Sequence, residues 1–143
     1  MSVMQTSVIE AAKAQVLAYN KKDWNAAKAA LTPDVTYDEV ATLRKIQGVD
    51  KVLEVWRGWA TAMPDSQASF DGEFATENTV VLQLTWRGTH TGPLRLPSGE
   101  IAPTGKKIEV RACQIIEVAD DKAQNIVQYF DMATLFRQLG IKL

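Results

Sequence analysis

The chain has 143 residues, of which 46% are hydrophobic and 23% are charged, and its formal net charge is -1. These values are typical of one ordinary globular domain, expected to span residues 1–143. The scattered Lys and Arg exclude the concentrated basic surface that a nucleic-acid partner requires. No apolar run approaches the roughly 20 residues of a membrane span, so we expect no membrane partner.

The compartment is indicated by the N-terminus and the cysteine content. The first residues lack the basic region and the long apolar core of a signal peptide. The lone Cys113 excludes an internal disulfide and fits a reducing compartment, so we expect a cytoplasmic protein. One cysteine and one histidine also leave little for a zinc site, and we expect no bound metal.

Three helices are predicted in the first half of the chain. Ser7-Val8-Ile9-Glu10 is a capping-box pattern, and apolar residues at helical spacing continue it to Asn20. Asp23 is suited to cap a second, short helix that runs to Leu31. After a short strand at residues 35–38, a third helix begins near Gly48 and ends at Pro64. Its apolar face consists of Val52, Val55, Trp56, Trp59 and Met63.

The second half is predicted to be mostly strands. Hydrophobic positions mark strands at about residues 68–74, 80–87, 108–118 and 125–131. Asp120-Asp121 indicates a turn, and a loop rich in Gly and Pro between residues 92 and 105 suggests a rim or a dimer contact. Helices first and antiparallel strands afterwards define an α+β class of fold.

The last strand leads into a C-terminal segment with a recognisable pattern. The run Asn125–Gly140 reads as a strand that breaks at Asp131 into a short helix closed by Gly140. With the segments 88–93 (Gly-Thr-His-Thr-Gly-Pro) and 102–107 (Ala-Pro-Thr-Gly-Lys-Lys), this run resembles the SnoaL-like polyketide cyclase family. The resemblance covers nearly the whole chain. It implies an NTF2-like cone, with N-terminal helices packed on a strongly curved, mainly antiparallel sheet, an internal pocket and a short C-terminal helix.

Two glutamines are the main candidates for the site. Gln114 and Gln128 each share a strand face with apolar residues, so both are predicted to point inward. A buried amide needs hydrogen-bond partners, which are either a ligand carbonyl or hydroxyl, or each other and nearby backbone. In the aldol cyclases that the chain resembles, a His matches Gln114 and an Asp matches Gln128, which makes both positions catalytic candidates. An amide is not a usable base near neutral pH, but it can polarise an oxyanion as a hydrogen-bond donor.

Asp38 is the candidate for a substitute acid or base, with a solvated surface charge as the alternative. Asp38 and Glu39 follow Tyr37 at the end of the first strand, a region that lines the pocket mouth in the resembled fold. Asp38 points to the side opposite Tyr37, so one of the two faces inward. Tyr37 is therefore a candidate substrate contact. Asp131 is expected to cap the last helix instead.

Large aromatic side chains provide the remaining candidate substrate contacts. They form either a stacking wall for a flat ligand or an ordinary core. These residues are Trp56, Trp59, Trp86 and Phe130. His90 joins them as a candidate if its strand stays regular, because it then shares a face with Trp86, whereas a bulge at Gly88 would reverse its direction. A structural or exposed histidine is the alternative.

We expect a cyclase- or isomerase-type enzyme that acts without a cofactor on a hydrophobic, carbonyl-bearing small molecule. No Gly-rich phosphate loop or dinucleotide fingerprint is present in the sequence, so no cofactor is expected. Three alternatives stay open: a non-catalytic module that binds small molecules, a cofactor-independent mono-oxygenase-type member of the family, and an association domain.

A homodimer is expected through the outer face of the sheet. In the resembled fold, sheets commonly pair through this face, and here it is polar with some apolar content. The residues predicted to lie on it are Gln83, Thr85, Arg87, Arg111, Cys113 and Tyr129.

Overall fold

The computed structural model describes residues 3–142, and its elements follow an α+β order. Helices α1 (Val3–Lys21), α2 (Trp24–Ala29) and α3 (Val49–Ala62) lie in the first half of the chain. Strands β1 (Leu31–Glu39) and β2 (Arg44–Gln47), joined through a short 3-10 turn at Val40–Thr42, form a hairpin between α2 and α3. The second half contains β3 (Gln67–Thr76), β4 (Thr79–Thr89), β5 (Leu94–Leu96), β6 (Gly99–Ile101), β7 (Lys107–Ala119), β8 (Lys122–Phe130) and the helix α4 (Met132–Gln138).

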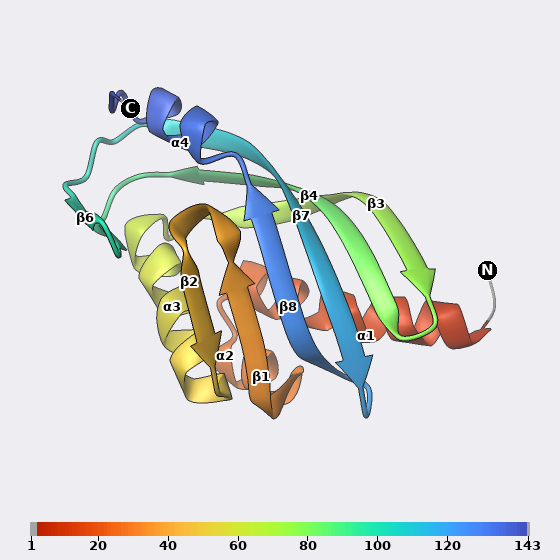
Figure 1. Ribbon diagram of the computed structural model, residues 1–143. Helices are drawn as coiled ribbons and strands as arrows, with labels where there is room; N and C mark the ends of the chain where they lie inside the picture. The colour runs from red at the N-terminus through yellow and green to blue at the C-terminus, as the bar shows by residue number, and fades with distance from the viewer. Residues whose placement is uncertain (1–2, 143) are drawn as a thin grey trace.

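Six of the strands form one curved sheet in the order β2-β1-β8-β7-β4-β3. Neighbouring strands are antiparallel except β1 and β8, which are parallel. Figure 1 shows α1, α2 and α3 covering one face of this sheet, while α4 lies beyond the end of β8. The long strands β4 and β7 bend along their whole length, so the sheet has a concave side that faces the helices.

The core lies between the helices and the concave side of the sheet. Leu82, Leu84, Ile116 and Ile126 are fully buried on the inner faces of β4, β7 and β8. They belong to one apolar cluster with the buried side of α3, which includes Trp56. Buried and exposed residues alternate along β7, as a strand with one covered face requires.

Two aspartates cap helices as the sequence predicts. The Asp23 side chain accepts a hydrogen bond from the Ala26 N–H at the start of α2. The Asp131 side chain accepts one from the Thr134 N–H at the start of α4 and another from the Thr134 hydroxyl. These bonds, the hydroxyl's first, lower the pKa of Asp131. Asp131 is therefore occupied by the backbone of α4. The Asp120-Asp121 turn is also present, with both residues at positive φ.

Several predicted boundaries are wrong. Helix α1 already includes Val3, so Ser7 lies inside the helix and the capping box does not form its start. Leu31 belongs to β1 instead of α2, because its main chain pairs with Ala123 of β8. This long-range pairing overrides the local helical pattern, which carried no information about it.

Two short paired segments are absent from the prediction. The segment rich in Gly and Pro contains the hairpin β5–β6, and β2 pairs with β1 at the edge of the main sheet. Strand β2 has four residues, and β5 and β6 have three each. Strands this short are too brief for a clear alternation of apolar side chains. Among residues 3–142, no helix is long and apolar enough to cross a membrane.

The stability of the cone should depend strongly on its buried leucines. We expect Leu84→Ala to lower the free energy of unfolding by about 2–5 kcal/mol, because it opens a cavity in a packed core. Leu43→Ala is the matched control, since Leu43 is 90% exposed. Its effect should stay within about 0.5 kcal/mol. Chemical denaturation followed by circular dichroism measures both variants, and equal losses at the two positions would contradict this core.

Candidate functional site

A cavity lies inside the cone, between α1, α3 and the concave side of the sheet, and α4 contributes Leu135 to its wall. About 90 Å³ of it is open to the centre of a water-sized sphere. A single water needs only roughly 10–15 Å³ by a comparable measure, so the space suits a small organic molecule. The lining residues are Gln15, Val16, Tyr19, Tyr37, Trp56, Trp59, Met63, Ser66, Trp86, Ile108, Val110, Gln114, Gln128, Phe130 and Leu135.

Edge-to-face pairs of aromatic rings form much of the wall. The ring of Tyr37 lies 5.6 Å from that of Trp56, and the ring of Trp59 lies 5.8 Å from that of Phe130. Trp86 pairs in the same way with Tyr19, at 5.2 Å. Such pairs hold large flat side chains in fixed orientations. The cavity therefore has rigid apolar walls that suit a flat hydrophobic ligand.

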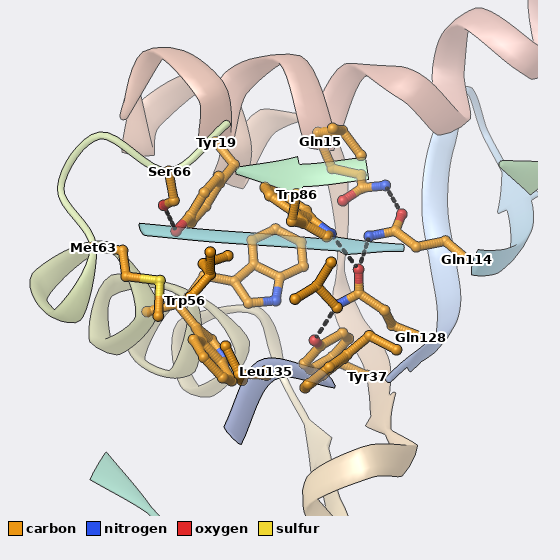
Figure 2. Close-up of a pocket in the computed structure, with 15 residues that line it drawn as sticks. Gln15, Tyr19, Tyr37, Trp56, Met63, Ser66, Trp86, Gln114, Gln128 and Leu135 are labelled. Atoms are coloured by element: carbon orange, nitrogen blue, oxygen red, sulfur yellow. Dashed lines mark hydrogen bonds between the residues drawn. The ribbon is translucent and has the colours of Figure 1, made fainter. Parts of the chain in front are cut away.

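A row of three glutamine amides crosses the cavity wall. Gln15 Nε2 donates to Gln114 Oε1 at 2.7 Å, and Gln114 Nε2 donates to Gln128 Oε1 at 3.0 Å. Gln128 Nε2 then donates to the Tyr37 hydroxyl at 2.8 Å. Figure 2 shows this row running from Gln15 on α1 to Tyr37 on β1. Gln114 and Gln128 point inward, as strand alternation predicts, and they are hydrogen-bonded to each other.

Hydrogen-bond partners at the two ends of the row determine which side-chain atom of each amide is oxygen and which is nitrogen. Trp86 Nε1, which can only donate, is 3.1 Å from Gln128 Oε1, so that atom must be the amide oxygen. Gln15 Nε2 also donates to the Ala12 carbonyl at 3.0 Å, which fixes the other end. Gln15 is not among the residues predicted for the site. The pattern that could have identified it is a polar residue on the apolar face of α1, at helical spacing from Ala12 and Tyr19.

At the β1 end, the row reaches a buried carboxylate. The Tyr37 hydroxyl donates to Glu39 Oε2 at 2.6 Å, and Trp59 Nε1 donates to the same oxygen at 2.9 Å. Glu39 Oε1 accepts from Thr42 Oγ1 at 2.6 Å and pairs with Arg44 Nη2 at 2.7 Å. The Glu39 side chain has no exposed surface. A buried carboxylate with this set of donors is stabilised as an ion.

Glu39, and not Asp38, is the carboxylate on the inner face of β1. Tyr37 and Glu39 are buried, while Asp38 between them is only partly buried and does not line the cavity. Tyr37 and Glu39 are two residues apart on an extended strand, so their side chains share a face. Strand alternation predicts that one of Tyr37 and Asp38 faces inward, and it is Tyr37 that lines the cavity. This geometry does not support Asp38 as the substitute acid or base.

His90 lies outside the cavity. It is fully buried where β4 ends, and its Nδ1 accepts a hydrogen bond from the Thr104 N–H at 3.2 Å. Burial lowers the pKa of His90, which favours the neutral ring. His90 thus links the end of β4 to the segment that precedes β7, and it is not among the residues that line the cavity.

Two tyrosines of the cavity keep their protons over a wide pH range. Burial raises the pKa of Tyr19 to about 12, and its hydroxyl is hydrogen-bonded to Ser66. Burial and the negative charge of Glu39 raise the pKa of Tyr37 well above its ordinary value. Both hydroxyls are therefore neutral hydrogen-bonding groups near neutral pH. Within residues 3–142, no group of three or more His, Cys, Asp or Glu side chains is arranged to hold a metal ion.

Helices packed on a curved sheet, with an apolar pocket enclosed between them, define a protein of the NTF2-like class. Within this class, residues 9–139 match the model of the SnoaL-like polyketide cyclase family. The chain belongs to that family. None of the curated proteins compared with the chain matches it.

Solved structures share this fold over nearly the whole chain. TsrD from Streptomyces laurentii superposes with a TM-score of 0.82 at 22% identity, covering 99% of this chain and 100% of that chain. IdmH from Streptomyces antibioticus, a proposed polyketide cyclase, has a TM-score of 0.79 at 20% identity, with 94% and 99% covered. AclR from Streptomyces galilaeus, a proposed hydroxylase, has a TM-score of 0.80 at 20% identity, with 97% and 88% covered. Identities this low show a common fold, so the activity must be argued from the site.

The raised tyrosine pKa values predict a loss of stability in alkali. An unfolded tyrosine titrates near 10. Because the pKa of Tyr19 is raised to about 12, its contribution is fully present below about pH 10 and is lost as the pH rises towards 12. We expect Tyr19→Phe to flatten the fall in unfolding free energy over this interval, as measured by urea denaturation at several pH values. Tyr129→Phe, at a tyrosine that is 47% exposed, is the control. An unchanged fall in Tyr19→Phe would contradict the burial of this hydroxyl.

Proposed function

We propose that this protein binds a hydrophobic, carbonyl-bearing small molecule inside the cone and converts it, without a cofactor, in a cyclase- or isomerase-type reaction. The observation that carries the proposal is the row of amides in an otherwise aromatic and aliphatic cavity. Apolar walls supply most of the binding free energy of such a ligand, and a few polar groups orient it. Membership of the SnoaL-like polyketide cyclase family supports the same class of substrate.

The glutamines are suited to bind a carbonyl oxygen. Gln114 and Gln128 each donate one N–H bond within the row, and a primary amide carries two. The second N–H of either amide is a donor for a ligand carbonyl. The same donor stabilises negative charge on that oxygen if a neighbouring C–H bond is broken, which is the contribution of an oxyanion hole.

A non-catalytic binding module is the second candidate function. One specific observation favours it: the residues that line the cavity, within the described part of the chain, include no Asp, Glu or His. The amides bind and polarise a ligand but do not transfer its protons near neutral pH. The two candidates share the ligand and differ only in turnover.

Ligand binding tests the common part of both candidates. We expect 2-tetralone, a flat bicyclic ketone, to bind more tightly than tetralin, the hydrocarbon without the carbonyl. Gln114→Leu and Gln128→Leu should each weaken 2-tetralone binding by about 2- to 10-fold, the worth of one hydrogen bond, and leave tetralin binding unchanged. Quenching of tryptophan fluorescence reports occupancy, because Trp56, Trp59 and Trp86 line the cavity. Equal affinities for the two compounds in all variants would contradict carbonyl recognition.

We also propose that two copies associate through the outer face of the sheet. Phe74, Val81, Ile115 and Val127 lie opposite one another on β3, β4, β7 and β8, forming an apolar row on that face. Phe74 is 57% exposed and Ile115 is 37% exposed. Farther along β4 and β7, the same face carries polar residues and the Arg87–Glu109 ion pair. An exposed apolar row with a polar margin is typical of an association surface.

A charge placed in this apolar row should prevent association. We expect the parent protein to sediment as a dimer at micromolar concentration and Ile115→Glu to sediment as a monomer, because the variant buries a charge in the interface. Lys51→Glu, on the exposed side of α3, is the control and should stay dimeric. A monomeric parent would refute the proposed dimer.

A further inference from the structure

The buried carboxylate Glu39 lies beside Gln128, one of the glutamines that line the cavity. In the parallel pair β1–β8, Glu39 is the register partner of Gln128. Paired residues on neighbouring strands point to the same side of a sheet, so both side chains face the interior of the cone. The carboxylate of this chain is therefore displaced by one strand from the position that Gln128 occupies.

Glu39 is connected to the cavity by hydrogen bonds from two side chains that line it. Tyr37 and Trp59 both donate to Glu39 Oε2, at 2.6 and 2.9 Å, while Oε1 is held by Thr42 and Arg44. Of the two donors to Oε2, only the Tyr37 hydroxyl can pass on a proton and accept another, because an indole N–H is a donor only. The Tyr37 oxygen accepts one bond, from Gln128, and has a second lone pair.

From these contacts we propose that Glu39, acting through the Tyr37 hydroxyl, is the proton acceptor of this site and abstracts a proton next to a ligand carbonyl. The inference rests on the proposed function and adds the base that the cavity lining lacks. It assigns Tyr37 as the group that touches the substrate and Glu39 as the group that receives the proton.

The proton transfer balances in one step. The substrate C–H bond breaks and its proton bonds to the Tyr37 oxygen. The electron pair of that bond forms a C=C bond while the carbonyl π pair moves to the oxygen, which gives an enolate. The original Tyr37 proton moves at the same time to Glu39 Oε2. Tyr37 ends neutral, Glu39 ends as a carboxylic acid, and the enolate receives hydrogen bonds from the glutamine amides. Return of the proton, to the same or another carbon, restores Glu39.

The charges around Tyr37 favour this concerted transfer. The pKa of Tyr37 is raised well above its ordinary value by burial and by Glu39, so a free phenolate is not a populated base. Arg44 balances the charge of Glu39 and is itself partly exposed to solvent, so it remains solvated when Glu39 is protonated. A carboxylate is a weak base for a simple ketone. The substrate therefore needs a C–H activated twice, by a carbonyl and by a second carbonyl or an aromatic ring.

Hydrogen exchange tests the transfer without knowledge of the natural product. The C1 hydrogens of 2-tetralone lie between a carbonyl and an aromatic ring, and their exchange for deuterium in heavy water is followed by proton NMR. We expect the parent protein to accelerate this exchange over buffer. Glu39→Gln and Tyr37→Phe should each lower the protein-catalysed rate by about 10²- to 10⁴-fold, the usual contribution of a general base. In Glu39→Gln, affinity for 2-tetralone should stay close to that of the parent, because Glu39 does not line the cavity. Retained affinity separates a lost proton acceptor from a collapsed pocket.

Controls distinguish the inference from its alternatives. Glu54→Gln makes the same chemical change on the exposed side of α3 and should retain the full exchange rate. Tyr37→Phe leaves the Glu39–Arg44 ion pair in place, so it remains informative if Glu39→Gln does not fold. Exchange that survives both substitutions, or that is lost only in Asp38→Asn, would overturn the inference. A parent that binds 2-tetralone without exchanging it would also overturn the inference while leaving the binding function intact. A parent that does not bind 2-tetralone would overturn both.

Discussion

The burial of one negative charge constrains the whole interior of this protein. The Glu39 side chain has no exposed surface, and an unpaired charge in that position would be strongly destabilising. Arg44 balances the charge, and Thr42, Tyr37 and Trp59 donate the hydrogen bonds that replace water. Because the carboxylate can only accept, the Tyr37 proton must point towards it. Tyr37 then accepts from Gln128, and the direction of the whole amide row follows.

The parallel pairing of β1 with β8 makes this arrangement possible. It places a residue from the first third of the chain beside one from the last strand, with Glu39 opposite Gln128. Strand β7 adds Gln114, α1 supplies Gln15 and α3 supplies the Trp59 indole. A polar network built from five separate elements holds its geometry only if the cone is fully folded. The orientation of the polar groups in the site therefore depends on the rigid packing of the whole cone.

A shared fold does not by itself determine the chemistry of a site. TsrD, IdmH and AclR share this backbone at only 20–22% identity, so the chemistry of this chain must be argued from its own cavity lining. In this chain, the cavity lining includes the amides of Gln15, Gln114 and Gln128 and, among the described residues, no Asp, Glu or His. The polar groups of the cavity are consequently donors and acceptors of hydrogen bonds, and the nearest charge is held one residue layer behind them, at Glu39.

Local patterns in the sequence determined the α+β order, the inward direction of Gln114 and Gln128, and the caps at Asp23 and Asp131. Each depends on side-chain alternation or on hydrogen bonds within a few residues, which are properties of the chain itself. The tertiary structure decided that Leu31 begins a strand, that Glu39 faces inward while Asp38 does not, that His90 lies away from the cavity, and that Gln15 completes the row. These outcomes depend on which strand pairs with which, and on where a helix lies across the sheet. Such contacts join residues far apart along the chain, so no local pattern specifies them.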